Sequence, residues 1–258
     1  MSRFFTTLKE RNAILYVAGW VCIGCTLLCG LLVLVSRTQV LGINAFIKPA
    51  KFFASIAIFL WTMGWFTGLL TQRRAVTIYS WVVVLVMAFE MAVIVGQASR
   101  GQLSHFNVHS LASGILFTLM GIAITTATLW TAYIGYLFVV KPPIGLPTAY
   151  LWGIRSGILI FVIFAFEGFM MAGRLAHTVG ALDGGPGLPV VNWSTQYGDL
   201  RIAHFFGMHA LQLIPLFGYY LARRPFQVVL FTILYGGGVT FLLLNALAGR
   251  PLLAGLGN

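Results

Sequence analysis

The sequence predicts an all-α integral membrane protein, a bundle of about seven transmembrane helices. Of its 258 residues, 59% are hydrophobic and only 8% are charged, whereas a soluble domain carries about 25% charged residues. The mean hydropathy is +0.93. A chain this apolar must use lipid as its solvent, and in lipid a helix satisfies its own backbone hydrogen bonds.

Seven apolar segments are long enough, at about 20 residues each, to cross a bilayer. They are residues 13–35, 49–71, 76–97, 108–140, 150–173, 202–222 and 226–247. The fourth is longer than one crossing needs and is expected to tilt or to extend beyond the bilayer. Together they predict a single polytopic domain over 1–258, without a separate soluble domain.

Proline and capping residues mark the ends of these segments. Pro49 is expected at the first position of the second helix. Asp199 is expected to be the N-cap of the sixth helix, and Pro225 separates the last two segments. Between the fifth and sixth segments lies a long loop, about 174–201, whose GGPGLP stretch excludes regular structure; loops of this length are often functional.

The positions of the basic residues predict the orientation. They concentrate in the N-terminal flank and after the second, fourth and sixth segments: Arg3, Lys9, Arg11, Arg73, Arg74, Lys141, Arg223 and Arg224. By the positive-inside rule the N-terminus is cytoplasmic and the C-terminus extracytoplasmic. We read the net charge of +11 as topogenic and lipid-binding rather than as a nucleic-acid signal. A multi-pass protein of a bacterial inner membrane is therefore expected.

Every histidine lies near the predicted extracytoplasmic ends of the apolar segments: His105, His109, His177, His204 and His209. At membrane depth, Glu90, Glu167 and His209 each lie seven or eight residues from a helix end, about 10–12 Å below the surface. Ionisable groups in hydrocarbon are costly and usually functional. We expect a shared pocket in which Glu90 and Glu167 are catalytic. An equally supported alternative is that these groups form buried hydrogen bonds that only hold the helices together.

Spacing suggests which imidazoles could bind a metal. His105 and His109 share a face if both are helical, whereas His204 and His209, five residues apart, diverge by about 140°. We therefore expect His109 and His209 to be the ligands, with His105, His204 and His177 contributing at the second shell or from loops.

The favoured function is redox chemistry at haem b or a transition metal ion, with a quinol as a possible partner. His109 and His209 would supply axial bonds to the iron, and Arg100, Arg201 and Lys51 would hold the propionates.

Two alternatives stay open. A metal hydrolase would add Glu90 or Glu167 as a third ligand and attack a lipid-borne substrate, although the HEXXH, GxSxG and P-loop patterns are absent from the sequence. An anion or proton-coupled transporter would use a basic mouth formed by Lys48, Lys51, Arg100 and Arg201, with Glu90 and Glu167 carrying protons. No residue pattern selects a substrate or an oligomeric state.

Overall fold

The computed structural model describes residues 3–252, and within them the chain is mostly helical, with very little strand. Seven of its helices are long and apolar enough to span a membrane, which confirms the all-α multi-pass architecture. The chain divides into two compact units, Met1–Pro143 (unit 1) and Ile144–Asn258 (unit 2). Each unit has its own helices, loops and polar end.

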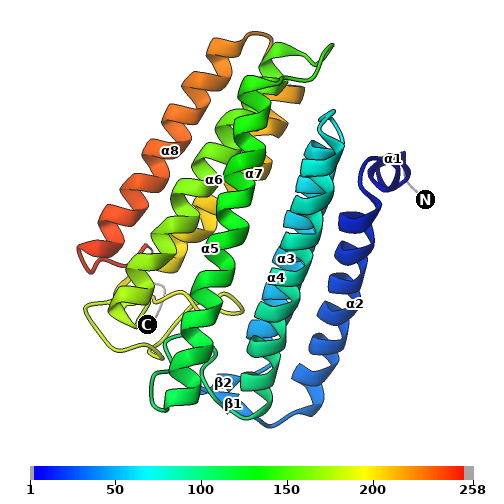
Figure 1. Ribbon diagram of the computed structural model, residues 1–258. Helices are drawn as coiled ribbons and strands as arrows, with labels where there is room; N and C mark the ends of the chain where they lie inside the picture. The colour runs from blue at the N-terminus through cyan, green and yellow to red at the C-terminus, as the bar shows by residue number, and fades with distance from the viewer. Residues whose placement is uncertain (1–2, 253–258) are drawn as a thin grey trace. The chain divides into compact units, whose positions relative to one another are not determined.

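Unit 1 is built from five helices. They are α1 (Arg3–Arg11), α2 (Ala13–Val35), α3 (Ile47–Thr67), α4 (Arg73–Ser99) and α5 (Leu111–Val140). Helix α3 packs against α1, α2 and α4, and α5 packs against α4 (Figure 1). Asn12 links these elements, because its side chain caps α2 and donates hydrogen bonds to Thr67 and Ser80.

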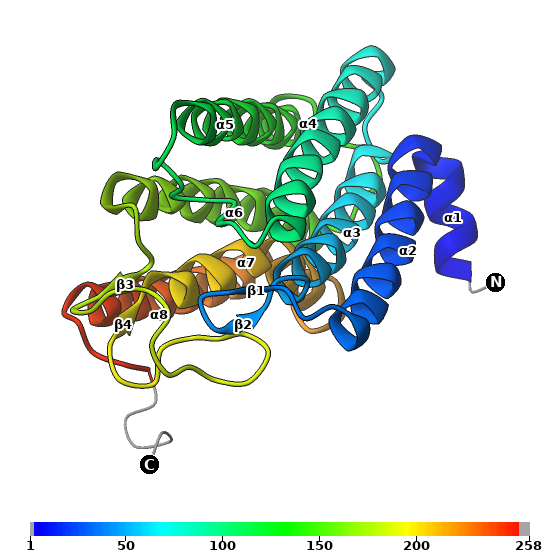
Figure 2. The same cartoon turned by 90° about the horizontal axis from the view of Figure 1, so that it is seen from below.

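A short hairpin of β1 (Gln39–Val40) and β2 (Ile43–Asn44) joins α2 to α3. Gly42 adopts a φ of 76° in its turn, a conformation that glycine accepts without strain. Thr38 and Gln39 lie against Gly101 of the α4–α5 connection, since a Cβ on that glycine would meet both residues at 3.5 Å. The two connections therefore meet at one end of unit 1 (Figure 2).

Unit 2 is a three-helix unit. Its elements are α6 (Thr148–Arg174), β3 (Thr178–Val179), β4 (Gly198–Asp199), α7 (Leu200–Tyr220) and α8 (Pro225–Leu247). Helices α6 and α7 form the most extensive helix pair. They approach closely because Gly207 faces Phe164 and Gly153 faces Pro215, with no room for a Cβ on either glycine. Small residues are the usual means of close helix packing in membranes.

The helix boundaries agree with the sequence prediction to within a few residues, and three details differ. Helix α1 was not expected, because its polar, basic sequence resembles a topogenic flank. Pro49 is the third residue of α3 rather than the first, a position in the first turn where its missing N–H still costs nothing. His105 and His109 lie in a non-helical connection, so the shared helical face considered for them does not form.

Candidate functional site

A carboxylate–imidazole pair joins α6 to α7 inside unit 2. The His204 Nδ1 atom lies 3.1 Å from Glu167 Oε2. An ionised carboxylate can only accept, so in that state the imidazole donates from Nδ1. Glu167 is 6% exposed, while the His204 ring is about one-third exposed. The pair therefore links a buried acid to a base that solvent or a ligand can reach.

Two glycines set the distance between these side chains. Gly168 follows Glu167 on α6, and a Cβ there would lie 3.3 Å from His204 Cε1. Gly207 is one turn beyond His204 on α7 and leaves room only for Phe164. The close approach of α6 and α7 thus brings an imidazole within hydrogen-bond reach of a carboxylate set seven residues inside the helix.

The second oxygen of Glu167 is unusual. Oε1 is buried and has no hydrogen-bond partner among residues 3–252, and the same is true of Glu90 Oε1 on α4 of unit 1. Buried polar atoms are nearly always satisfied in proteins, so each exception needs an explanation. These two carboxylates are the groups that the sequence marked as functional at membrane depth.

Asp199 organises the loop that covers the start of α7. It caps that helix as predicted, accepting from the backbone N–H of Arg201, and it accepts a further backbone bond from Ser194. The Arg201 guanidinium donates to both of its oxygens, at 2.9 and 2.6 Å, and also to the carbonyl of Asn192. Trp193 then packs on Phe205 with 5.5 Å between the ring centroids.

Charge stabilises this arrangement. Burial alone would raise the pKa of Asp199, but the hydrogen bond and charge of Arg201, the Ser194 N–H and the nearby His177 outweigh burial. The net effect is a pKa below the ordinary value of an aspartate. Arg201, expected from the sequence to hold a cofactor carboxylate, is bound here to a carboxylate of its own chain.

His177 lies in the same loop and also faces acids. Its Nδ1 is 3.2 Å from Asp183 Oδ1 and 3.9 Å from Asp199 Oδ1. Asp183 in turn accepts hydrogen bonds from the backbone N–H groups of His177 and Thr178. Residues 167–204, which we call the acidic end of unit 2, thus hold three carboxylates and two arginines.

His209 has a different partner from His204. Its Nδ1 lies 3.2 Å from Gln212 Oε1, on the face that the sequence predicted for these two residues. The ring also packs edge-on to Phe205, with 4.4 Å between centroids. Counting residues from the helix ends placed His209 at the depth of Glu167, but the imidazole that reaches Glu167 belongs to His204.

In unit 1, His105 has a basic neighbour. Lys48 Nζ lies 3.4 Å from His105 Nδ1, and Ser104 Oγ lies 3.1 Å from the same atom. An ammonium group can only donate, so His105 Nδ1 accepts. His109 is exposed in the α4–α5 connection, as is Arg100 at the C-cap of α4, and Lys51 is half-buried in the first turn of α3.

Sequence reasoning assigned no functional role to Asp183 or Asn192. Both lie in the long loop that the GGPGLP stretch marked, but no spacing rule identifies which loop residues meet after folding. Gln212 was identified only as sharing a face with His209.

Among residues 3–252, no group of three or more His, Cys, Asp or Glu side chains is arranged to hold a metal ion. Comparison of the chain with protein-family models, curated proteins and solved structures found no match.

Proposed function

We propose that this chain is a proton-coupled membrane transport protein whose Glu167–His204 pair takes up and releases the proton. The observation that carries the proposal is the pair itself, a buried carboxylate with one oxygen 3.1 Å from an imidazole and the other oxygen without a partner in the described chain. Intramembrane Glu and His residues are the usual components of proton relays in pumps and transporters. We also propose that the membrane it spans is a bacterial inner membrane.

The pair has two protonation states of different charge. An ionised Glu167 with a neutral His204 has a net charge of −1, and one added proton makes the pair neutral whichever side chain holds it. Burying net charge is costly, so the protonated pair suits a closed, dry state and the charged pair suits a hydrated one. Proton binding is thereby coupled to a change in the access of water to the pair.

The transported partner is proposed to be an anion. The chain has a net charge of +11, which favours negatively charged molecules near its surface. A proton bound at Glu167 would offset the charge of a co-transported anion. This reading develops the transporter alternative that the sequence left open.

Infrared difference spectroscopy of the purified full chain tests the proton site directly. The difference spectrum between acidic and alkaline samples should contain a carboxyl band that disappears in Glu167→Gln and shifts in His204→Gln. Glu10→Gln is the matched control, because Glu10 is exposed on α1.

Proton flux in proteoliposomes gives the second readout. With an imposed pH gradient and an entrapped pH dye, Glu167→Gln should abolish proton movement coupled to a panel of small anions, while Glu10→Gln should retain it. A folded Glu167→Gln protein with an unchanged carboxyl band and unchanged flux would overturn the proposal.

Redox chemistry at a metal ion or haem is a second candidate, favoured by how the α7 imidazoles are held. His204 and His209 each place Nδ1 against an oxygen, of Glu167 and Gln212 respectively. Neither Nε2 atom has a hydrogen-bond partner in the described chain, and metal-binding histidines are commonly held in this way. Since the rings diverge by about 140°, each would bind separately, and a haem would need its second axial ligand elsewhere, with a quinol as the electron partner.

Metal analysis and an absorption spectrum of the purified protein distinguish this candidate from the first. Near-stoichiometric iron with a Soret band that is lost in His204→Ala or His209→Ala would favour haem. A transition metal without that band would favour a mononuclear site. Metal-free protein that retains the Glu167 carboxyl band in the infrared difference spectrum would leave proton coupling as the only candidate of the two.

A further inference from the structure

Two adjoining hollows lie where the α4–α5 connection meets α5 in unit 1. The first, of about 320 Å³, is lined by Gly101, Gln102, Leu103, Asn107, His109, Ser110 and Ser113. The second, of about 500 Å³, is lined by Val108, Ser110, Leu111, Gly114, Ile115, Phe117, Thr118 and Leu119. Both volumes lie in the range of small-molecule sites. They share Ser110, so one molecule can occupy both.

The first hollow is polar. Asn107 and Ser113, both more than nine-tenths buried, contribute to its wall, and His109, Gln102 and Ser110 add exposed polar groups. The wall contains no carboxylate. Its hydroxyl, amide and imidazole groups suit a small hydrogen-bonding group such as a phosphate.

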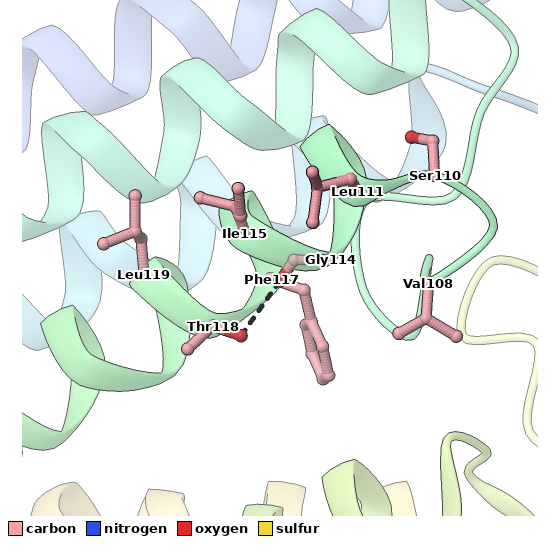
Figure 3. Close-up of a pocket in the computed structure, with 8 residues that line it drawn as sticks. All are labelled: Val108, Ser110, Leu111, Gly114, Ile115, Phe117, Thr118 and Leu119. Atoms are coloured by element: carbon pink, nitrogen blue, oxygen red, sulfur yellow. Dashed lines mark hydrogen bonds between the residues drawn. The ribbon is translucent and has the colours of Figure 1, made fainter.

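The second hollow is an apolar groove along α5. Leu111, Ile115 and Leu119, spaced four residues apart, line one side of the helix, and Phe117 extends to the other (Figure 3). A Cβ on Gly114 would have no atom within 4 Å, so the groove is open at this position. The Leu111 and Ile115 side chains are largely exposed, so the groove opens to the surroundings of the helix.

The surroundings of both hollows are strongly basic. Residues 36–51 and 97–113, which we call the basic end of unit 1, contain Arg37, Lys48, Lys51 and Arg100 and no acidic residue. These two segments touch, through Lys48 beside His105 and through Gly101 beside Gln39. Basic residues near a membrane surface attract anions.

We infer that the two hollows form one binding site for an anionic phospholipid. The phosphate headgroup occupies the polar hollow beside His109 and Ser110, and an acyl chain lies in the groove over Gly114. A free inorganic anion would use only the polar hollow, whereas the continuity at Ser110 and the open groove fit a ligand with both a charged head and an apolar tail.

Native mass spectrometry of the delipidated full chain tests this site. The protein is mixed with equal amounts of phosphatidylglycerol and phosphatidylcholine that carry identical acyl chains. The unaltered chain should retain phosphatidylglycerol at least about fivefold better, since one Lys or Arg near the surface contributes about that factor. Equal retention of the two lipids would mean ordinary boundary lipid and would overturn the inference.

Gly114→Leu tests the groove without disturbing the fold. A Cβ at this position meets no atom within 4 Å, and leucine has a higher helix propensity than glycine. The longer side chain should occupy the groove and reduce phosphatidylglycerol retention about tenfold. Gly121→Leu is the matched control, because Gly121 lies seven residues further along α5, also has no neighbour within 4 Å, and is outside the groove. Equal effects of the two variants would overturn the groove assignment.

Two further experiments test the role of charge and whether the ligand is a lipid or a free anion. Arg100→Gln should lower the preference for phosphatidylglycerol about fivefold, whereas Arg74→Gln, which removes the same exposed charge from the other end of α4, should not. If millimolar inorganic phosphate displaces the lipid and Gly114→Leu has no effect, the site takes free anions and the phospholipid inference is wrong.

Discussion

In the basic end of unit 1, His105 accepts a hydrogen bond from the ammonium of Lys48, whereas in the acidic end of unit 2 the imidazole of His204 lies beside the carboxylate of Glu167. The two units use the same residue type in opposite electrostatic surroundings. Unit 1 gathers cations there without a carboxylate, and unit 2 gathers three carboxylates. The chemistry available to a histidine therefore depends on its neighbours rather than on its place near a membrane end.

The comparison extends to the helix caps. Asn12 caps α2 of unit 1 and links Thr67 and Ser80 through a neutral amide. Asp199 caps α7 of unit 2 and links the loop through a carboxylate paired with Arg201. The buried cap in unit 1 is thus held by neutral hydrogen bonds, while the cap in unit 2 depends on an ion pair. Substitutions that remove a charge should therefore destabilise the cap in unit 2 more than the cap in unit 1.

The largest expected effect is on the charged cap. Asp199→Asn keeps the shape of the side chain but leaves Arg201 without its buried partner, and we expect a loss of about 3–5 kcal/mol in the free energy of unfolding. Denaturant titration in detergent micelles measures it. Hydrogen exchange should locate the damage in residues 186–201.

The matched control is Asp183→Asn, in the same loop. Asp183 is more exposed than Asp199 and has no arginine partner among residues 3–252. The asparagine keeps one oxygen that can accept the backbone N–H bonds, so we expect a loss of about 1 kcal/mol, typical of one lost hydrogen bond. Equal losses in the two variants would show that the Arg201 pair is not what holds this end of unit 2.

The next effect concerns helix spacing. Gly207→Ala places a Cβ against Phe164 and should cost about 1–3 kcal/mol through overpacking. It should also separate His204 from Glu167 and thereby shift the infrared carboxyl band. Gly237→Ala, at an unobstructed position in α8, should instead gain up to about 1 kcal/mol. A destabilised Gly207→Ala protein with an unshifted band would show that the pair does not depend on this spacing.

The spans were predictable because an apolar run of about 20 residues is long enough to cross the bilayer as an α-helix, which satisfies its own backbone hydrogen bonds in lipid. The cap at Asp199 was predictable because a carboxylate before a helix satisfies free N–H groups. Helix α1 was missed, since its apolar residues are few and become buried only by packing on α2 and α3.

The partner of Glu167 was not predictable by counting depth. His204 is nearer the start of α7 than His209, and its ring reaches Glu167 because Gly168 and Gly207 let the two helices approach. A sequence gives the height of each residue along its own helix, but not the separation and rotation of two helices. The hollows beside α5 were missed because the non-helical connection of residues 100–110 lines most of the first and adjoins the second, and its path does not follow from the sequence.

The smallest effect is the response to mild acid. Because the pKa of Asp199 lies below its ordinary value, its carboxylate stays ionised in the folded chain from pH 7 down to about pH 4, and its contribution to stability stays intact. The contribution then falls as the pH drops from the unfolded pKa of about 3.9 through the lower folded pKa. The hydrogen-exchange protection factors of residues 186–201, measured relative to the intrinsic rate at each pH, should therefore fall only below about pH 4. Residues around Asn12, held by a neutral amide, should show no such fall. A fall in protection already at about pH 6 would show that Asp199 is not the group that makes this end of unit 2 sensitive to acid.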